Sequence, residues 1–327
     1  MKCVVTGGSG FIGTNLLNAI VLSKQFSTVV SLDAVPSPRV VPGVDSVQLD
    51  IRDLASLSRP LKDADIVFHL AASANVDRIK DDPLFAVENN ISATATVLEA
   101  SRRAGVRRFV FASTVWVYIG ATDFLLTEDT MLFPAARTNL YASTKIASEL
   151  LCRTYEEQYG LGCTILRFDT PYGPYMRPEL VVHRFVHLAM NGLPLTIAGG
   201  GDQTRHFIHV RDLSECAILA AISPIAAGKT YNVIGPRPVS IRELAEVVRD
   251  SVSGVCEVTS VDGRPSDSAG RSIIDTVIQN ELGWRPTIDI RDGIKEFLAW
   301  LNDYESFDEL SETPSKRKGD STCQLQI

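Results

Sequence analysis

The sequence predicts an α/β protein built on a doubly wound parallel sheet, with a smaller α/β lobe toward its C-terminal end. Short apolar strand patterns alternate with helical patterns as far as residue 168, a glycine-rich segment joins the first strand to the first helix, and the alternation becomes irregular after residue 168. We therefore expect a first domain at residues 1–168 and a second at 169–305, with segments that cross back to the first. Residues 306–327 are poor in apolar side chains, and we expect a disordered tail there.

The elements of the first domain follow from the spacing of their apolar residues. Strands are expected where short apolar runs occur, and helices where apolar residues recur every three or four positions. The helix expected at 83–104, for example, carries Phe85, Ile91 and Leu98 and ends before Gly105. The predicted strands are 2–5, 27–32, 44–49, 65–72, 106–112 and 163–168, and the predicted helices are 14–24, 83–104 and 139–159.

The second half is too irregular for another doubly wound sheet. Its strand patterns are short and are separated by helical patterns of unequal length. The predicted helices are 179–191, 212–222, 241–252, 275–282 and 291–304, and the predicted strands are 195–197, 207–210 and 231–234. This arrangement predicts a smaller lobe that completes the first domain.

The glycine-rich segment at residues 6–13 (TGGSGFIG) lies between the first strand and the first helix. Gly7 permits a tight turn, Gly10 lets the backbone approach a pyrophosphate, and Gly13 lets the helix pack closely on the strand. The N-terminus of the helix offers unpaired N–H groups to phosphates. The alternative is an ordinary glycine-rich connection, but the flanking strand and helix favour a dinucleotide-binding unit of the Rossmann type.

Acidic residues after the next two strands indicate how a dinucleotide would be held. Asp33 ends the second strand, where a carboxylate accepts hydrogen bonds from both ribose hydroxyls and repels a 2′-phosphate. This favours NAD over NADP; the alternative is a solvated acid at a strand end. Asp50 follows the third strand and could accept a hydrogen bond from an adenine amino group; the alternative is that this segment caps a helix from Asp53 onward.

Composition excludes several classes of function. The chain has 327 residues and a formal charge of −7, which argues against nucleic acid or an anionic membrane as its partner. Its six cysteines are dispersed, so neither a disulfide framework nor a metal site is indicated. The first strand begins at residue 2 and no apolar run is long enough to span a bilayer, so we expect no signal peptide and a cytoplasmic location.

A tyrosine and a lysine on the helix at 139–159 are the candidate catalytic pair. Tyr141 and Lys145 are four residues apart and therefore lie on one face of the helix, one turn apart. A nearby ammonium and a cationic nicotinamide would lower the pKa of the tyrosine toward that of a useful base. Ser113 and Thr114 end the neighbouring strand, where they could bond a reacting hydroxyl. The alternative for the pair is an amphipathic helix surface; His69 is expected to be a satisfied wall residue.

Together these residues resemble the extended short-chain dehydrogenase/reductase family and, within it, the NAD-dependent sugar-nucleotide epimerases and dehydratases, such as UDP-glucose 4-epimerase. The resemblance covers residues 2–300 approximately and is specific when the motifs are taken together. Beside the glycine segment and Asp33, the motifs are DIRD (50–53), HLAA (69–72), NNISAT (89–94), STVWVY (113–118), YASTK (141–145), LRFDTPYGP (166–174), GGGDQTRHF (199–207) and LGWRP (282–286).

The resemblance implies roles for individual residues. Tyr141 would be the base, Lys145 would bind the nicotinamide ribose and tune that base, and Thr114 would contact the reacting hydroxyl. Phe168 and Pro171 would flank the nicotinamide. The substrate contacts implied are Thr114, Thr170, Arg205 and Arg264, of which the two arginines would grip the diphosphate. The remaining cofactor contacts implied are Gly7, Gly10, Phe11, Ile12, Gly13, Asp33, Asp50, Ile51, Leu70, Ala71, Ala72, Asn90 and Ser113, with Tyr141 and Lys145.

Departures from the family pattern bear on the reaction. Dehydratases of the family carry an Asp-Glu pair after the Ser/Thr, whereas this chain has Val115 and Trp116. Without that acid and base, proton abstraction at C5 and loss of water are disfavoured, so we expect epimerisation. Thr170 stands where the family usually has Asn, and His206 replaces a usual Asp. Because of these two departures, the sequence does not determine which nucleotide sugar is the substrate.

The expected function is therefore NAD-dependent C4 epimerisation of a nucleotide sugar through a transient 4-keto intermediate. A UDP-hexose, UDP-hexuronate or UDP-N-acetylhexosamine is the favoured substrate. The alternatives are a 4-ketoreductase, dehydrogenase or dehydratase of the same family, and a non-catalytic NAD-binding protein. The resemblance also implies a homodimer formed through the helices at 83–104 and 139–160.

Overall fold

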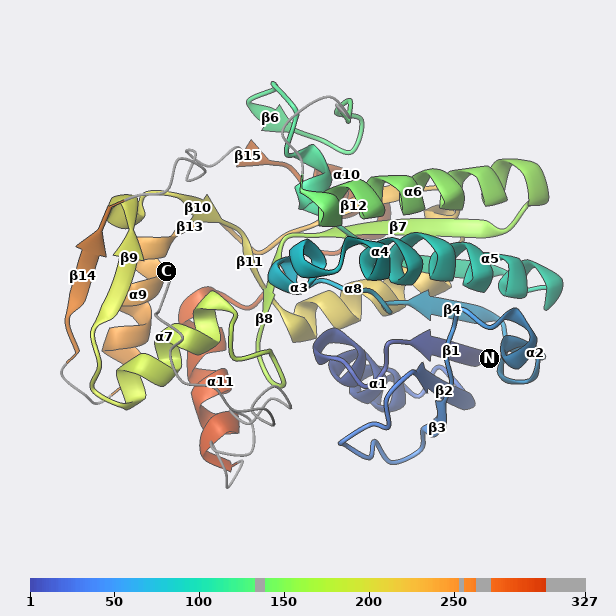
Figure 1. Cartoon of the computed structure of the whole chain (residues 1–327), viewed down its shortest axis with the longest axis horizontal. Helices are drawn as coiled ribbons and strands as arrows, with labels where there is room; N and C mark the ends of the chain where they lie inside the picture. The colour runs from blue at the N-terminus through green and yellow to red at the C-terminus, as the bar shows by residue number, and fades with distance from the viewer. Residues whose placement is uncertain (133–138, 253–255, 263–271, 304–327) are drawn as a thin grey trace.

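The described part of the chain forms a parallel sheet covered by helices on both faces, with a smaller lobe beside it (Figure 1). The structure, a computed structural model, describes residues 1–132, 139–252, 256–262 and 272–303. In the order of the sheet, the seven strands found among these residues are β12 (Thr230–Val233), β7 (Gly162–Phe168), β5 (Arg108–Thr114), β4 (Ile66–His69), β1 (Lys2–Thr6), β2 (Thr28–Asp33) and β3 (Asp45–Gln48). All neighbouring pairs are parallel, which confirms the predicted Rossmann-type fold.

Most helices lie where the apolar spacing predicted them, with ends that differ by a few residues, but the helix at 54–61 was expected only as an alternative and the helix at 76–81 was not predicted. The helices are α1 (Phe11–Ser23), α2 (Leu54–Leu61), α3 (Val76–Asp81), α4 (Pro83–Val87), α5 (Ala93–Arg103), α6 (Leu140–Tyr159), α7 (Val181–Met190), α8 (Val210–Ile222), α9 (Ile241–Ser251), α10 (Thr276–Leu282) and α11 (Ile290–Asp303). Helix α1 begins three residues before the predicted start, because the N–H of Thr14 already donates to the carbonyl of Gly10. The glycine-rich segment thus supplies the first turn of the helix.

One predicted helix is interrupted. Residues 83–104 form α4, a π-helical turn at Glu88–Ser92, and α5. The turn frees the carbonyl of Asn90, which accepts hydrogen bonds from the hydroxyls of Thr94 (2.6 Å) and Ser148 (2.8 Å). Periodicity alone does not reveal such a turn, because it depends on hydroxyl groups from the same helix and from α6.

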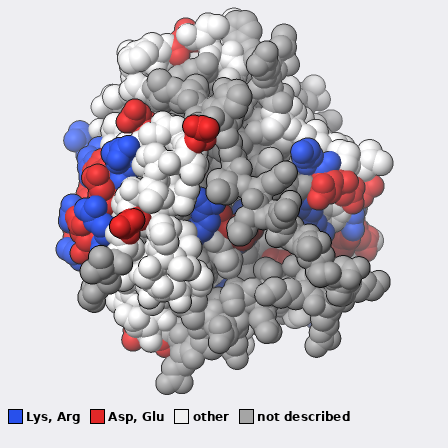
Figure 2. All heavy atoms as spheres, turned by 60° about the vertical axis from the view of Figure 1, so that its left-hand side comes forward, with Lys and Arg blue, Asp and Glu red and all other residues white. Residues whose placement is uncertain are grey.

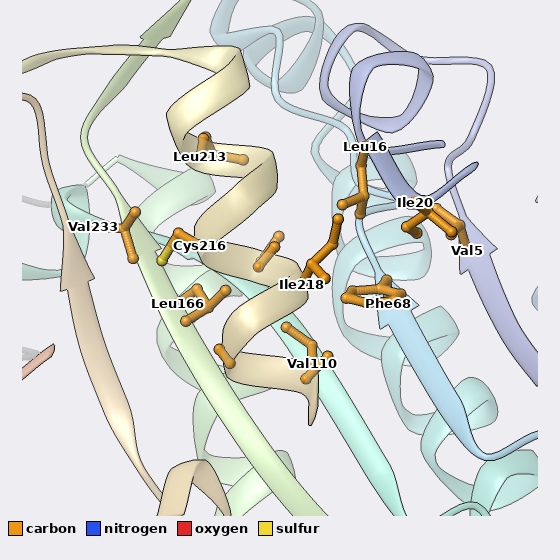
Figure 3. Close-up of a cluster of buried hydrophobic side chains, with 14 of the residues drawn as sticks. Val5, Leu16, Ile20, Phe68, Val110, Leu166, Leu213, Cys216, Ile218 and Val233 are labelled. Carbon is orange, nitrogen blue, oxygen red and sulfur yellow. The ribbon is translucent and has the colours of Figure 1, made fainter. Parts of the chain in front are cut away.

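Alternating residues of the strands face two separate apolar layers. Cys3 and Val5 of β1 pack with α1 and α8 on one face, whereas Val4 packs with α2, α5 and α6 on the other. Figure 3 shows the first layer, in which Cys216 of α8 lies beside Leu166 and Val233 of the strands and Ile218 lies near Leu16 and Phe68. A helix from the second half therefore covers one face of the main sheet, and β12 extends the sheet beside β7.

The smaller lobe is built from short strands and three helices around its own core. Helices α7, α9 and α11 pack around Phe185, Leu244 and Phe297. Its strands are β8 (Thr170–Tyr172), β9 (Leu195–Ala198), β10 (Thr204–Arg205), β11 (Phe207–His209), β13 (Val239–Ser240) and β14 (Val258–Val261), while β6 (Leu125–Leu126) pairs with β15 (Ser272–Ile273). The predicted boundary at residue 168 stays a prediction, and the predicted tail at 306–327 lies outside the described residues.

The surface and the helices bear on possible partners. On the lobe side of the molecule, basic and acidic side chains stand together at both margins of the described surface, so neither sign dominates there (Figure 2). In the described part of the chain, no helix combines the length and apolarity needed to cross a membrane. Helices α4 and α5 pack beside α6, but the homodimer and the cytoplasmic location stay predictions.

Candidate active site

A cavity of about 660 Å³ opens between the carboxyl ends of the main strands and the smaller lobe. In doubly wound sheets this edge is where ligands bind. Segments from both halves line this cavity. The first half supplies residues of the glycine-rich segment and of the ends of β4, β5 and α6: Gly7, Gly10, Phe11, Ile12, Gly13, Leu70, Ala72, Thr114, Trp116 and Tyr141. The residues after β7 and those of the lobe are Asp169, Thr170, Pro171, Arg177, Glu179, Arg184, Phe185, Ile197, Gln203, Arg205 and Ile241.

The glycine-rich segment fits the pyrophosphate of a dinucleotide. Gly7 has φ +75°, and a Cβ there would lie 2.7 Å from the backbone nitrogen of Ala71. A Cβ on Gly13 would meet the carbonyl of Gly7. Side chains at these positions would therefore close the turn whose first helical N–H groups can face an anion. The carboxylate of Asp33 accepts the N–H of Ser9 (3.0 Å) beside this turn, where ribose hydroxyls could reach it.

Two residues after β4 lie at the edge of the cavity. Leu70 and Ala72 line the cavity, and the N–H of Leu70 donates to the carbonyl of Thr6, which holds the two strand ends together. His69 is fully buried and hydrogen-bonded to Thr6 (2.7 Å) and Thr94 (3.0 Å). Burial lowers the pKa of His69 to about 3, so this residue is a neutral, satisfied wall residue.

Helix α6 places Tyr141 in the cavity and Lys145 beneath it. The side chain of Asn139 caps the helix by accepting the N–H of Ala142 (2.8 Å). Lys145 is buried, donates to the carbonyl of Ala112 (2.8 Å), and has its Nζ 5.9 Å from the centre of the Tyr141 ring. Burial raises the pKa of Tyr141 to about 12 and lowers the pKa of Lys145 to about 8. The charge near Tyr141 that partly lowers its pKa belongs to Arg177, not to Lys145.

The two hydroxyl residues at the end of β5 point in different directions. Thr114 lines the cavity and accepts the N–H of Trp116 (3.2 Å), which leaves its own O–H to donate. Ser113 instead donates to the carboxylate of Glu149 (2.5 Å) in the interior. Because successive residues of a strand face opposite sides, both hydroxyls could not reach one ligand. Only Thr114 remains a candidate for the reacting hydroxyl.

Other predicted cofactor residues lie away from the cavity wall. Asp50 forms an ion pair with Arg52 (2.6 Å), which lowers the pKa of that carboxyl, and Asp53 caps α2, as the alternative interpretation expected. Ile51 does not line the cavity in the described structure. Asn90 is buried and bonds both backbone groups of Ser73 (2.7 and 2.9 Å), so it positions the loop after β4.

The predicted residues after β7 are divided between core and cavity. Phe168 packs in the apolar layer with α8, while Pro171 lines the cavity. Thr170 also lines the cavity, and its hydroxyl donates to Asp169 (2.8 Å). Arg205 reaches the cavity from β10 and donates to the carbonyl of Thr204 (2.7 Å). Arg264, the second arginine expected at the diphosphate, lies outside the described residues.

Sequence reasoning missed a buried polar network under α6. Arg167 forms an ion pair with Glu149 (2.7 Å), and both side chains are at least 98% buried, with relative exposures of 1% and 2%. Arg167 also donates to the hydroxyl of Tyr118 (2.7 Å), which in turn donates to Asn232 of β12 (2.7 Å). A charge in the otherwise apolar strand pattern at 163–168 was the available signal, because buried charges need partners.

Four charged residues of the cavity wall were also missed: Asp169, Arg177, Glu179 and Arg184. Arg177 and Arg184 line the cavity beside Arg205, and Asp169 adds a carboxylate. Each lies in a different part of the segment 169–184, after β7 or on α7, where no spacing rule relates them. Only the folded structure shows that these residues line the same cavity.

A Rossmann-type sheet whose glycine turn, β5 end and tyrosine helix open into one cavity is typical of dinucleotide-dependent enzymes of small-molecule metabolism. The chain belongs to the NAD dependent epimerase/dehydratase family, whose family model matches residues 3–234. This confirms the predicted family and its cofactor, NAD.

Similar proteins include both reaction types of the family. The low-salt glycan biosynthesis protein Agl12 of Haloferax volcanii is 32% identical over 312 residues, which cover 90% of this chain and 96% of that protein. The dTDP-glucose 4,6-dehydratase DesIV of Streptomyces venezuelae, solved with NAD bound, has a TM-score of 0.84, 30% identity, and coverage of 95% of this chain and 100% of that one. The UDP-glucose 4-epimerase of Thermotoga maritima has a TM-score of 0.85, 25% identity, and coverage of 94% and 100%.

Proposed function

We propose that the protein is an NAD-dependent 4-epimerase of a nucleotide sugar, with a UDP-hexose, UDP-hexuronate or UDP-N-acetylhexosamine as substrate. The observation that carries this proposal is the cavity itself. It joins Thr114 and Tyr141 to the glycine turn, while Val115 and Trp116 occupy the positions where a dehydratase needs carboxyl groups. The similarity to the Thermotoga maritima UDP-glucose 4-epimerase supports the same reaction.

The residues of the chain divide the work of such a reaction. NAD, when bound, supplies the hydride acceptor and donor. Tyr141 takes the proton from the 4-hydroxyl and later returns it, and Thr114 donates a hydrogen bond to the same oxygen. Because burial holds the pKa of Tyr141 at about 12, the phenolate must be stabilised by a positive charge, and Arg177 is the side chain whose charge lowers this pKa. The 4-keto sugar must turn over inside the cavity of about 660 Å³ so that its other face is reduced.

Dehydration is a second candidate, favoured by two specific observations. DesIV is a dTDP-glucose 4,6-dehydratase of similar fold and sequence. In addition, the acidic residue Asp169 is among the residues that line the cavity. We favour epimerisation because Asp169 follows β7, not β5, and is already engaged by two neighbouring side chains.

Tyr141→Phe tests the proposal. Loss of a general acid–base group of this kind lowers turnover by about 10²–10⁴-fold. We expect Tyr141→Phe to show this loss of turnover. NAD should still be bound, because the phenol hydroxyl is not part of the glycine turn. Turnover is measured by NMR of the sugar products after incubation with UDP-, dTDP-, CDP- and GDP-sugars, and bound NAD by its release on denaturation.

Tyr159→Phe is the matched control, since Tyr159 lies at the exposed end of the same helix. The turnover rate of Tyr159→Phe should equal that of the wild type. A C4 epimer formed without added NAD supports the proposal, and a product that has lost water moves the assignment to the second candidate. Full activity in Tyr141→Phe contradicts both.

A further inference from the structure

Trp116 is the exposed member of a short turn whose other members are buried. Strand β5 continues into a four-residue 3₁₀ turn. Its members Val115, Val117 and Tyr118 are at most 8% exposed and pack in one apolar cluster. Trp116 is 39% exposed and belongs to none of the apolar clusters in the described part of the chain. Its indole therefore projects away from the core that holds the turn.

The order of the strands places this turn at the reacting end of the cavity. The glycine turn follows β1, and β5 is two strands away from β1, with β4 between them. At about 4.8 Å per strand, the end of β5 lies about 10 Å from the glycine turn. Trp116 lines the same cavity as Thr114 and Tyr141, and its backbone N–H donates to the hydroxyl oxygen of Thr114 (3.2 Å). Trp116 thus lies beside the groups assigned to the reacting hydroxyl, beyond the pyrophosphate site.

A large apolar side chain at this point suits a sugar ring. An indole offers a flat apolar face and one N–H donor, and cavities that bind small ligands are commonly lined by such groups. Within the described residues, Trp116 forms hydrogen bonds only through its backbone, so its indole N–H is available to a ligand. A pyranose carries C–H groups on its faces and hydroxyls around its edge. It can therefore pack on the indole while a hydroxyl accepts the indole N–H.

The position of Trp116 also separates the sugar from the nucleotide base. A base would stack on an indole as well as a sugar does. In a nucleotide sugar, however, the base and the reacting ring lie on opposite sides of the diphosphate. A ring whose hydroxyl reaches Thr114 and Tyr141 is the part of the substrate next to Trp116, and the base is directed away from it.

We propose that Trp116 is the sugar platform of the site: its indole stacks on the C–H face of the pyranose ring of the nucleotide sugar. The inference rests on the proposed function and assigns the residue that recognises the sugar portion of the substrate. Stacking has no fixed hydrogen-bond direction, and both faces of a pyranose carry C–H groups. The same indole therefore holds the ring before and after the 4-keto sugar turns over, which a set of directional hydrogen bonds would oppose.

The test compares the binding of UDP and UDP-glucose by calorimetry, using the full chain loaded with NAD. UDP lacks the sugar, so the comparison isolates the sugar contact. Trp116→Ala should weaken the binding of UDP-glucose about tenfold and change that of UDP less than about twofold. Trp116→Phe keeps an aromatic face and should weaken UDP-glucose less than about threefold. Phe124→Ala is the matched control and should bind both ligands like the wild type, because Phe124 is an exposed aromatic residue outside the described cavity lining.

Tryptophan fluorescence gives a second readout of the same contact. The chain has three tryptophans, of which Trp284 is buried. UDP-glucose should change the emission of the wild type more than UDP does, because only UDP-glucose covers the indole of Trp116. Trp116→Phe should lose this difference while it still binds UDP-glucose.

Each outcome decides the inference. An unchanged affinity for UDP-glucose in Trp116→Ala would overturn it, as would equal losses for UDP and UDP-glucose, or a wild type that does not bind UDP-glucose. If Trp116→Ala does not fold, Trp116→Phe decides, and a sugar-dependent emission change that persists in this variant overturns the inference. The products are followed separately by NMR. Dehydration in place of epimerisation would remove the proposed function and leave the sugar platform standing, whereas a C4 epimer with an unchanged affinity in Trp116→Ala would remove only the platform.

Discussion

The first 168 residues and the smaller lobe prepare their sides of the cavity in different ways. The first part offers backbone: a turn that requires Gly7 and Gly13, and the free N–H groups at the start of α1. The lobe side offers side chains, notably Arg177, Arg184 and Arg205, from separate elements. Backbone recognition depends on residues close together in the sequence, whereas side-chain recognition depends on how distant elements fold.

The largest expected effect concerns a glycine of the first part. Gly7→Ala would place a Cβ 2.7 Å from the backbone of Ala71 at φ +75°. Strain and overpacking together should lower the free energy of unfolding by about 5 kcal/mol and abolish NAD retention. Gly192 of the lobe is the matched control, because it has φ +65° with no atom within 4 Å of the added Cβ.

Gly192→Ala should lower the free energy of unfolding by about 1–2 kcal/mol only. Chemical denaturation and the NAD content of the purified variants measure both effects. Equal losses in the two variants would show that the glycine turn has no special role, and the contrast between the two regions would fail.

The second prediction concerns the buried network that joins the two parts. Glu149→Gln keeps the shape but leaves the charge of Arg167 without a buried counter-ion. We expect the free energy of unfolding to fall by about 4 kcal/mol. Glu99→Gln removes a carboxylate that pairs with Arg102 and Arg103 on the surface, and it should change the free energy of unfolding little. Similar stabilities of the two variants in urea would contradict a structural role for the network.

The sequence predicted the fold and the local parts of the site, and it failed where distant residues meet. Gly7, Asp33 and the Tyr141–Lys145 pair follow from strand ends and from helical spacing. The contact between Asp169 and His206 joins residues 37 positions apart and needed the folded chain. Ser113 is a different kind of failure, because strand alternation already implied that it and Thr114 face opposite sides.

The third prediction uses pH to compare a buried lysine with an exposed one. Burial lowers the pKa of Lys145 to about 8 from 10.5. Between these values the folded state binds fewer protons than the unfolded state, so the free energy of unfolding should rise with pH across this window, by about 3 kcal/mol from this group. Lys145→Met should lose that rise, while Lys295→Met, at an exposed site on α11, should keep it. Denaturation at pH 8 and pH 10 measures the slopes; a wild-type slope that persists in Lys145→Met contradicts the assignment.

The smallest expected effect is confined to the lobe side. Arg205→Ala should raise the KM for the nucleotide sugar by about 10- to 100-fold, equivalent to about 1.4–2.7 kcal/mol for lost charge-assisted hydrogen bonds. Bound NAD should be unchanged, because the glycine turn does not involve this side chain. The KM of Arg205→Lys should lie between that of the wild type and that of Arg205→Ala, since lysine keeps the charge but not the planar guanidinium group. Arg153→Ala, at an exposed position on α6, is the control. If Arg205→Ala lost NAD and substrate together, the two regions would not be separable binding surfaces, and the contrast between backbone and side-chain recognition would have to be abandoned.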